Sequence, residues 1–565
     1  MIRARILYTL VILLGCAGWL TALQPSQARE AGDMPITCTF RNPLLALGQD
    51  PSVAQRDGFY YLVQSNSTAS GFSIYKSPTL TGLAEAQPVD IYTAPAVGNY
   101  SRNLWAPELL YLRGSWYIYY AADDGNNDHH RIYVLQADTD DPAGSWTFKG
   151  PLFTTPELDR WSIDLTVFEH NDRMFAVWSG AGGTDDDVRF SYPQRLFIAE
   201  MSDPLTVIGE RVPILTPDQP WEMSVAAIAE GPQSYIHNGQ ITIVYSADAS
   251  WSRAYKLAAT RLDGDDPLDP SAWTKIGVVF EGTISDDGAV YGVGHNSNPV
   301  QSPDGSEWWN VYHAKTNEAD GWGDRNIRAQ RFTWNDDNTP EFGVPIPVEI
   351  SQQIPLGEPC GQTAAWSFDD IAELSDSTIS GAPQTVAGVS GSGLAFDGTA
   401  DSLEFSTPPI NTTGSYTVSA WVKLDDVGGN YTIVSQEGGL FNAFSLHLSP
   451  ETGTFALSVT NIMGEPEASA VATVPPEIGA WTHVAGVRDG LAQEIRLYIN
   501  GELAASAPFN ADWRAVRAFV LGASKERGQR THFFHGAMDE VTVYNGALSP
   551  EIVLQLAALY GEGDS

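Results

Sequence analysis

Five polar or ionisable side chains recur at matching positions along the N-terminal half of the chain. They are Asp50, Glu108, Asp164, Glu230 and His295, and each lies a few residues before a polar turn. A single Asp at such a position is usually a turn or capping residue. A charge within an otherwise apolar strand, however, is costly unless it is paired or functional. The repeated placement therefore favours one functional cluster over five unrelated turn residues.

Four carboxyl groups and one imidazole at a single place are suited to glycoside hydrolysis. That reaction needs one protonated carboxyl group to donate to the leaving oxygen and one ionised carboxylate to activate water. A third acid beside the donor raises the pKa of the donor by like-charge repulsion. The residue types alone supply all three roles but do not rank the candidates. Nearby, Trp105, Trp161 and Trp178 could stack on sugar faces or pack in the core, and we favour packing for Trp178.

A repeated pattern indicates which elements position these side chains. A polar turn followed by an aromatic-rich segment occurs five times, over residues 56–61, 113–120, 170–178, 237–245 and 303–312. Turns such as Asp57-Gly58 and Asn238-Gly239 favour tight hairpins, because these residues tolerate positive φ. Successive turns lie roughly 56 to 67 residues apart, which fits a four-stranded blade with insertions. We therefore expect an all-β fold with a five-bladed β-propeller over residues 36–360, whose inner strands line a central channel.

Two cysteines, Cys38 and Cys360, bracket this block. They are the only cysteines left if the chain is exported and cleaved after Ala28. An even pair in an oxidising compartment favours a disulfide, which would join the start of the propeller to its end. Two unrelated buried thiols are the alternative.

After Cys360 the blade period stops and short alternating segments follow, for example over residues 416–422, 444–448 and 495–501. Alternation of this kind is typical of strands with one buried face. We expect a jelly-roll β-sandwich over residues 363–562.

The N-terminus and the net charge restrict the location and the partners. Residues 1–28 read as a signal peptide, with Arg3 and Arg5 before an apolar run and small residues at Ser26 and Ala28. A secreted or periplasmic protein without a transmembrane segment in its mature chain is expected, and lipid attachment through Cys16 is a less favoured alternative. The net charge of −38 argues against nucleic acid and anionic membranes as partners. A neutral plant or algal polysaccharide or oligosaccharide fits better, and we expect a monomer.

The region from about residue 41 to 359 resembles glycoside hydrolase family 43, which comprises inverting enzymes with a five-bladed propeller. The resemblance rests on motifs at residues 49–53, 105–109, 163–164, 230–232, 294–297 and 328–332. It implies that Asp50 is the general base, that Glu230 is the general acid, and that Asp164 orients the acid and raises its pKa. It also implies that Glu108 is a supporting acid.

The same resemblance implies binding roles for three further residues and gives hints about the sugar. Trp105 and Arg328 would contact the sugar, and His295 would face a calcium ion in the channel through water. Residues 192–199 and 220–222 are similar to the branch that contains exo-acting α-L-arabinofuranosidases. The motif around His295 lacks the expected Pro before Gly294 and the aromatic residue after Ser297. A β-xylosidase, an endo-arabinanase or a galactan-active enzyme therefore remains an alternative, and a non-catalytic carbohydrate-binding protein is an alternative of another class.

The C-terminal region resembles laminin-G-like, concanavalin A-like sandwiches. The resemblance rests on residues 366–369, 393–398, 481–485 and 538–541. Such domains often bind carbohydrate and a structural calcium ion, and Asp369 and Asp539 would supply hard oxygen ligands for it. A purely structural domain is the alternative. No organic cofactor is expected.

Overall fold

The computed structural model of the chain describes residues 36–65, 70–181, 189–510 and 513–560. The expected signal peptide and Cys16 lie outside the described residues. Within the described part, none of the helices combines the length and the apolar character needed to cross a membrane.

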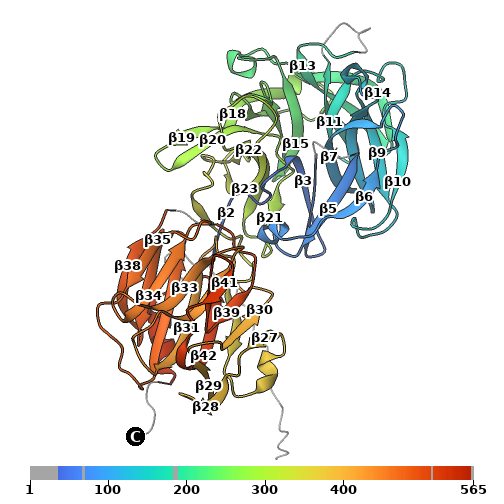
Figure 1. The fold of residues 1–565 in the computed structure, drawn as a ribbon. Coiled ribbons are helices and arrows are strands. Elements are labelled where there is room, and N and C mark those ends of the chain that lie inside the picture. The colour runs from blue at the N-terminus through green and yellow to red at the C-terminus, as the bar shows by residue number, and fades with distance from the viewer. Residues whose placement is uncertain (1–35, 66–69, 182–188, 511–512, 561–565) are drawn as a thin grey trace, which may run out of the picture. The chain divides into compact units, whose positions relative to one another are not determined.

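Five antiparallel sheets form the predicted five-bladed propeller (Figure 1). Blades 1 and 2 contain β3 (Gln49–Arg56), β4 (Phe59–Ser65), β5 (Gly71–Ser77), β6 (Val89–Thr93), β7 (Arg102–Leu112), β8 (Ser115–Asp123), β9 (Arg131–Ala137) and β10 (Trp146–Pro151). Blades 3 and 4 contain β11 (Ser162–His170), β12 (Arg173–Ala181), β13 (Gln194–Asp203), β14 (Thr206–Leu215), β15 (Ala229–His237), β16 (Gln240–Ala247), β17 (Lys256–Leu262) and β18 (Trp273–Glu281). Blade 5 contains β19 (Thr283–Ser285), β20 (Gly288–Gly294), β21 (Val300–Gln301), β22 (Trp308–Lys315), β23 (Arg325–Trp334) and β24 (Pro340–Glu341).

The first strand lies at the centre of the ring in blades 1 to 4, and in blade 5 the short strand β21 contacts β3. β3 contacts β7, β7 contacts β11, and β11 contacts β15. Short 3-10 helices η1 (Thr81–Ala84), η2 (Asn127–His129), η3 (Pro220–Glu222) and η4 (Pro270–Ala272) lie in the connections. Asp50, Glu108, Asp164 and Glu230 lie on inner strands, and His295 directly follows β20. The predicted placement on inner strands is therefore confirmed for the four acids, whereas His295 lies just beyond the end of its strand.

The turns that revealed the repeat adopt the backbone expected of them. Between β3 and β4, Asp57 and Gly58 have φ values of 52° and 78°, and between β15 and β16, Asn238 and Gly239 have values of 48° and 82°. Positive φ at both central residues is what a type I′ hairpin requires. Aromatic side chains then fill the space between blades. Trp178 is 2% exposed and its ring lies 4.7 Å from that of Phe153, so its predicted packing role is confirmed.

The ring closes where the first blade meets the fifth. The backbone N–H of Leu44 donates to the carbonyl oxygen of Ile327 on β23 (2.8 Å), and the N–H of Gly48 donates to that of Arg325 (3.1 Å). Next to this contact, β2 (Thr39–Arg41) pairs with β25 (Ser351–Gln353). The predicted Cys38–Cys360 disulfide is present and spans 322 residues of sequence.

The C-terminal region forms two antiparallel sheets, which confirms the predicted sandwich. One sheet contains β26 (Gly361–Trp366), β28 (Gln384–Ala387), β29 (Ser392–Asp397), β31 (Tyr416–Leu424), β36 (Thr482–Asp489), β37 (Glu494–Ile499), β38 (Glu502–Pro508) and β42 (His535–Asn545). The other contains β27 (Ser377–Ser380), β30 (Ser402–Phe405), β32 (Tyr431–Glu437), β33 (Asn442–Ser449), β34 (Thr454–Thr460), β35 (Pro466–Val471) and β39 (Phe519–Leu521).

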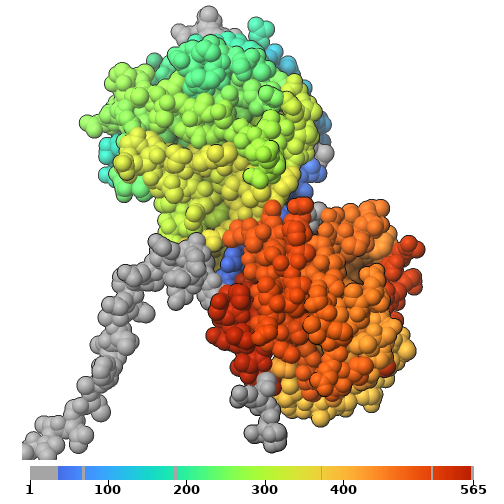
Figure 2. Space-filling view, turned by 90° about the vertical axis from the view of Figure 1, so that its left-hand side faces the viewer, coloured from blue at the N-terminus to red at the C-terminus, as the bar shows by residue number. Residues whose placement is uncertain are grey.

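Apolar side chains from both sheets, such as Val418 and Phe519, are fully buried in one core. In Figure 2 the sandwich runs in colour from yellow through orange to red. Its smaller elements are η5 (Ile371–Leu374), the β40 (Ser524–Glu526) and β41 (Gln529–Thr531) hairpin, α1 (Pro550–Ala558), and β43 (Ala547–Leu548), which pairs with β1 (Ile36–Thr37). Strand β26 begins at Gly361, slightly before the expected boundary at residue 363.

Candidate active site

Each inner strand is irregular where its polar side chain lies. The pairing register shifts beside the polar residue in all five blades. The backbone has positive φ at or within two residues of it, at Asp50 (50°), Ala106 (44°), Asp164 (53°), Gly231 (55°) and His295 (35°). Bulges of this kind change the direction of a side chain and are frequent next to active sites. A non-glycine residue in this conformation costs about 1–3 kcal/mol, so packing of the blades must hold it in place.

A cavity of about 650 Å³ lies at these irregularities. Its lining includes the predicted residues Asp50, Trp105, Asp164, Glu230 and His295. Trp161 lines it as well, and its indole N–H donates to the carbonyl oxygen of Asn127 (2.8 Å). The structure therefore brings the three predicted catalytic acids together with the imidazole and with aromatic side chains suited to a sugar.

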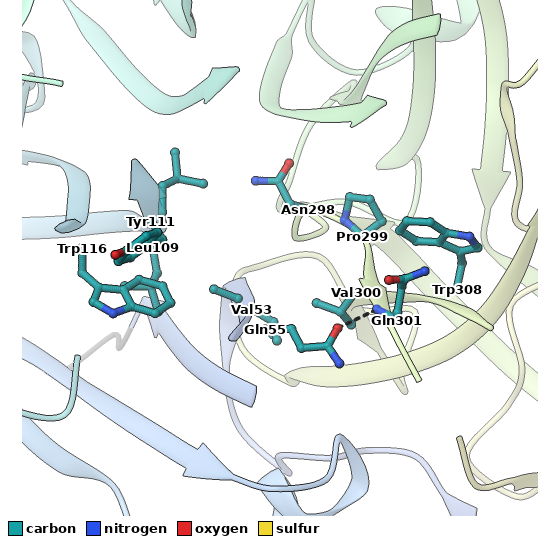
Figure 3. Close-up of a pocket in the computed structure, with 12 residues that line it drawn as sticks. Val53, Gln55, Leu109, Tyr111, Trp116, Asn298, Pro299, Val300, Gln301 and Trp308 are labelled. Atoms are coloured by element: carbon teal, nitrogen blue, oxygen red, sulfur yellow. Dashed lines mark hydrogen bonds between the residues drawn. The ribbon is translucent and has the colours of Figure 1, made fainter. Parts of the chain in front are cut away.

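A second cavity, of about 300 Å³, lies further along the same inner strands (Figure 3). Val53 and Gln55 come from β3, Leu109 and Tyr111 come from β7, and the backbone N–H of Gln301 donates to Gln55. No Asp, Glu or His is among the residues that line it. This cavity lacks the groups needed for acid–base chemistry, so the first cavity is the candidate active site.

Asp50 has the surroundings of an ionised carboxylate. Its carboxylate oxygen Oδ1 lies 3.5 Å from Arg325 Nη1 and 3.5 Å from His295 Nδ1. Its backbone N–H donates to Nδ1 of His313 (3.2 Å). Burial by itself would raise the pKa of Asp50, but His295, His313 and Arg325 outweigh burial and hold this pKa well below its usual range. Asp50 is therefore ionised and able to accept a proton.

Glu230 has the surroundings of a protonated acid. Its carboxyl group accepts hydrogen bonds from the Tyr255 hydroxyl (2.9 Å) and from the Gln194 side-chain amide (3.0 Å). Burial and, to a smaller extent, the charge of Asp50 raise the pKa of Glu230 to about 7, against the opposing effects of these hydrogen bonds and of Arg325. A carboxyl group with this pKa still carries its proton in weakly acidic solution, as a general acid requires.

Asp164 is joined to the acid through the backbone. Its Oδ2 accepts the N–H of Gly231, the residue that follows Glu230 (2.9 Å). Burial and then the neighbouring charge of Glu230 raise the pKa of Asp164 well above its usual value. Because the two acids repel each other when both are charged, the Asp164–Glu230 pair retains a proton that a single exposed carboxyl group would lose.

His295 lies between the base and the orienting acid. Its Nδ1 is 3.5 Å from Asp50 Oδ1 and 3.9 Å from Asp164 Oδ2, and its backbone N–H donates to Ser246 Oγ (2.7 Å). Burial lowers the pKa of His295, against the opposing effect of the neighbouring Asp50 carboxylate. Within the described residues, no group of three or more His, Cys, Asp or Glu side chains is placed to hold a metal ion. The side chains around His295 thus do not form a site at which they could ligate a cation directly.

The structure does not bring Arg328 to the cavity and places Arg325 there instead. The side chain of Arg328 is fully buried within blade 5, where its Nε donates to Asn326 Oδ1 (2.7 Å). Arg325 lies three residues earlier on β23 and lines the cavity beside Asp50. An offset of three residues reverses the face of a strand, so only one of the two arginines can face the sugar.

Glu108 lies below the cavity and joins the blades. Its carboxyl group accepts hydrogen bonds from Thr166 Oγ1 (3.0 Å), Gln233 Nε2 (3.0 Å) and Asn298 Nδ2 (2.8 Å), which come from blades 3, 4 and 5. Burial raises the pKa of Glu108 to about 7. The side chain is 3% exposed and does not reach the substrate cavity, so it acts as a structural acid at the channel.

Several side chains at the site carried no repeat signal in the sequence. Trp251 and Tyr255 lie in the connection from β16 to β17, and Trp322 lies in the connection from β22 to β23, where the blades differ in sequence. His313 lies on β22 itself, just after the repeated segment. Gln194 lies in the segment that resembles arabinofuranosidases, and only this resemblance could have indicated from the sequence that Gln194 belongs to the site.

Two family models match the chain. The model described as glycosyl hydrolases family 43 matches residues 40–340, and the concanavalin A-like lectin/glucanases superfamily model matches residues 397–554.

Known proteins match the same region. The chain is 31% identical over 401 residues to the extracellular exo-α-(1→5)-L-arabinofuranosidase of Streptomyces avermitilis, which covers 67% of this chain and 79% of that protein. It is 33% identical to the enzyme of the same name from Streptomyces chartreusis, over 53% of this chain and 88% of that protein. A crystal structure of an α-L-arabinofuranosidase from Lactobacillus brevis is 33% identical, with a TM-score of 0.51, over 55% of this chain and 98% of that chain.

Proposed function

Because the chain belongs to glycosyl hydrolase family 43, we propose that it is a secreted, inverting exo-α-L-arabinofuranosidase. Its substrates are arabinose side chains of plant arabinan or arabinoxylan. The observation that carries the chemistry is the contrast between Asp50, held ionised, and Glu230, held protonated, in one cavity. The names of the relatives at 31% and 33% identity support arabinose as the sugar.

In the proposed reaction, Asp50 takes a proton from water as the water oxygen bonds to the anomeric carbon. The bond from that carbon to the glycosidic oxygen breaks, and Glu230 gives its proton to the departing oxygen. Asp164 positions Glu230 through the Gly231 N–H and helps to keep it protonated. Inversion leaves room for the water between base and acid, so we predict a separation of about 6.5–9.5 Å between the carboxyl groups of Asp50 and Glu230.

The test of this assignment is the Glu230→Gln variant. The amide keeps the size of the side chain but has no proton to give, so kcat on natural arabinosides should fall by about a thousandfold. Circular dichroism and thermal melting should remain as in the wild type. Near-wild-type turnover by the folded variant would exclude Glu230 as the acid.

A substrate panel tests the sugar and the mode of attack. We expect release of monomeric arabinose from arabinan and from nitrophenyl α-L-arabinofuranoside. Preferential cleavage of nitrophenyl β-xyloside or a galactan, or release of arabino-oligosaccharides from linear arabinan, would assign the chain to another specificity of the family.

We also propose a structural calcium ion in the C-terminal domain, near two carboxylates that accept backbone N–H groups of one loop. The loop over residues 388–392 approaches two carboxylates. A Cβ atom on Gly388 would lie 2.2 Å from Asp539 Oδ2, and one on Gly391 would lie 2.1 Å from Asp369 Oδ1. Asp369, Asp539 and nearby carbonyl oxygens are the hard ligands that calcium prefers. Addition of a chelator should then lower the melting temperature of the wild type more than that of an Asp369→Asn variant.

Calcium in the channel, secretion and a monomeric state are further parts of the proposal. An ion beside His295 would have to be held through water. Two relatives are named extracellular, which supports secretion of this chain. Metal analysis of the purified protein and sedimentation equilibrium would test the ion and the oligomeric state.

A further inference from the structure

One aromatic wall of the active-site cavity has no role in the mechanism above. Trp251 and Trp322 line the cavity, and their ring centroids are 5.7 Å apart at an interplanar angle of 68°. Trp322 is 58% exposed and is the only exposed tryptophan in the described part of the chain. Large apolar side chains exposed at the edge of a binding cavity are typical of ligand contacts.

The loop that carries Trp322 is held in place by its surroundings. The buried ammonium group of Lys315 donates to the carbonyl oxygens of Ala319 and Gly321 (3.2 Å for Gly321). The N–H of Gly321 donates to the carbonyl oxygen of Trp251 (2.6 Å), which ties the two loops together. A contact surface fixed before binding loses little entropy when a ligand arrives.

Hydrogen bonds also fix the backbone and indole of Trp322. Arg325 Nε, next to the general base, donates to the carbonyl oxygen of Trp322 (3.1 Å). The indole N–H of Trp322 donates to Ser250 Oγ (3.2 Å). The ring is therefore positioned relative to the reacting groups, although it reaches none of them.

The other tryptophan of the pair is linked to the general acid. Trp251 lies in the connection from β16 to β17, and the same connection contains Tyr255, whose hydroxyl donates to Glu230 (2.9 Å). Strand β16 also pairs with β15, which carries Glu230. Trp251 therefore belongs to the same blade as Glu230, the group that protonates the leaving oxygen in the proposed reaction.

We propose that Trp251 and Trp322 form a platform on which the leaving-group sugar of an arabino-oligosaccharide stacks. This inference rests on the proposed function and deepens it, because it makes a chain of neutral sugars a better substrate than an arabinoside with a small leaving group. The C–H face of a sugar ring packs against an indole face, and the wall adds no charge. Tyr192, which is 48% exposed and also lines the cavity, is the competing contact.

The experiment compares two substrates that share the cleaved sugar and differ in the leaving group. The probes are α-1,5-linked arabinopentaose and methyl α-L-arabinofuranoside. For Trp322→Ala we expect kcat/KM on the pentaose to fall about tenfold, mainly through KM, and the value on the methyl glycoside to fall by at most about twofold. Trp322→Phe should restore most of the loss. The matched control is Ile208→Ala, which removes an exposed apolar side chain on β14, outside the cavity, and should change neither value.

Three results would overturn the platform and leave the proposed function in place. They are an unchanged pentaose value in Trp322→Ala, equal losses on both substrates in that variant, and a selective loss in Tyr192→Ala instead. A wild-type enzyme that releases arabinose from neither probe would overturn the proposed function and the platform with it. Thermal melting of each variant identifies losses caused by misfolding.

Discussion

Asp50 and Glu230 are both buried carboxyl groups, yet their pKa values move in opposite directions. Asp50 is close to Arg325 and two imidazoles, which favour its charged form. Glu230 has only neutral hydrogen-bond donors, Tyr255 and Gln194, so burial dominates. The environment of each group, and not its residue type, assigns the base and the acid.

These pKa directions determine the pH dependence of the enzyme. We expect kcat/KM on methyl α-L-arabinofuranoside to be independent of pH in weakly acidic solution, because Asp50 remains ionised there. Above about pH 7, Glu230 loses its proton and kcat/KM should fall about tenfold per pH unit. A profile measured from about pH 4 to pH 9 checks this, and an alkaline limb that stays level to pH 9 would contradict the pKa assigned to Glu230.

The cation beside the base provides a second residue-scale test. Arg325→Met removes a charge that stabilises ionised Asp50, so the pKa of Asp50 should rise and the acid limb of kcat/KM should move to higher pH. We also expect a loss of about tenfold at the optimum. The control is Arg328→Met, a buried arginine outside the cavity, whose acid limb should match the wild type. A shifted acid limb in Arg328→Met, together with an unchanged one in Arg325→Met, would show instead that Arg328 is the cation that stabilises ionised Asp50.

At the scale of elements, the repeat of polar turns predicted the strands well, and the local irregularities escaped prediction. Asp57-Gly58 and Asn238-Gly239 specify their hairpins through their own backbone preferences. The positive φ at Asp50 and Asp164 depends on contacts between blades that are remote in sequence. The bulges shift which residue of an inner strand faces the channel. Strand β23 is regular, and the motif alone did not show which of its two faces, with Arg325 or with Arg328, lies at the cavity.

The hydrogen bonds to Glu108 predict an effect on stability. Glu108→Ala would leave the buried donors of Thr166 and Gln233, and the partly buried donor of Asn298, without their acceptor, at about 1–3 kcal/mol for each buried donor. We expect the melting temperature to fall by about 5–10 °C. Glu108→Gln keeps one acceptor oxygen and should lose less. Equal melting temperatures for wild type and Glu108→Ala, by calorimetry, would show that the blades do not depend on this carboxyl group.

For the whole molecule, the motifs predicted the family and both domain types, and the family model over residues 40–340 confirms the resemblance. The repeat predicted five polar residues at matching places in the blades, and the resemblance to the family then selected three acids among them. Trp251 and Trp322 were not, because they lie in connections that differ between blades and their meeting depends on how blades 4 and 5 pack. A single sequence shows the repeated blade pattern, but it does not show which side chains of two neighbouring blades come into contact.

The disulfide makes a prediction at this scale. The bond between Cys38 and Cys360 closes 322 residues and restricts the unfolded chain, which stabilises the fold by about 2–4 kcal/mol. A Cys38→Ser, Cys360→Ser double variant should melt at lower temperature and keep the wild-type kcat/KM, because neither residue lines the cavity. Titration of the unfolded, unreduced mature protein should find no free thiol, and two titratable thiols would show that the bond does not form.

The central claim is that Asp50 and Glu230 invert an α-L-arabinofuranoside, and time-resolved proton NMR of the first product tests it most directly. Wild-type enzyme acting on nitrophenyl α-L-arabinofuranoside should release β-L-arabinofuranose first, with the α anomer growing in later by mutarotation. Initial release of the α anomer, or no release of arabinose, would contradict the account.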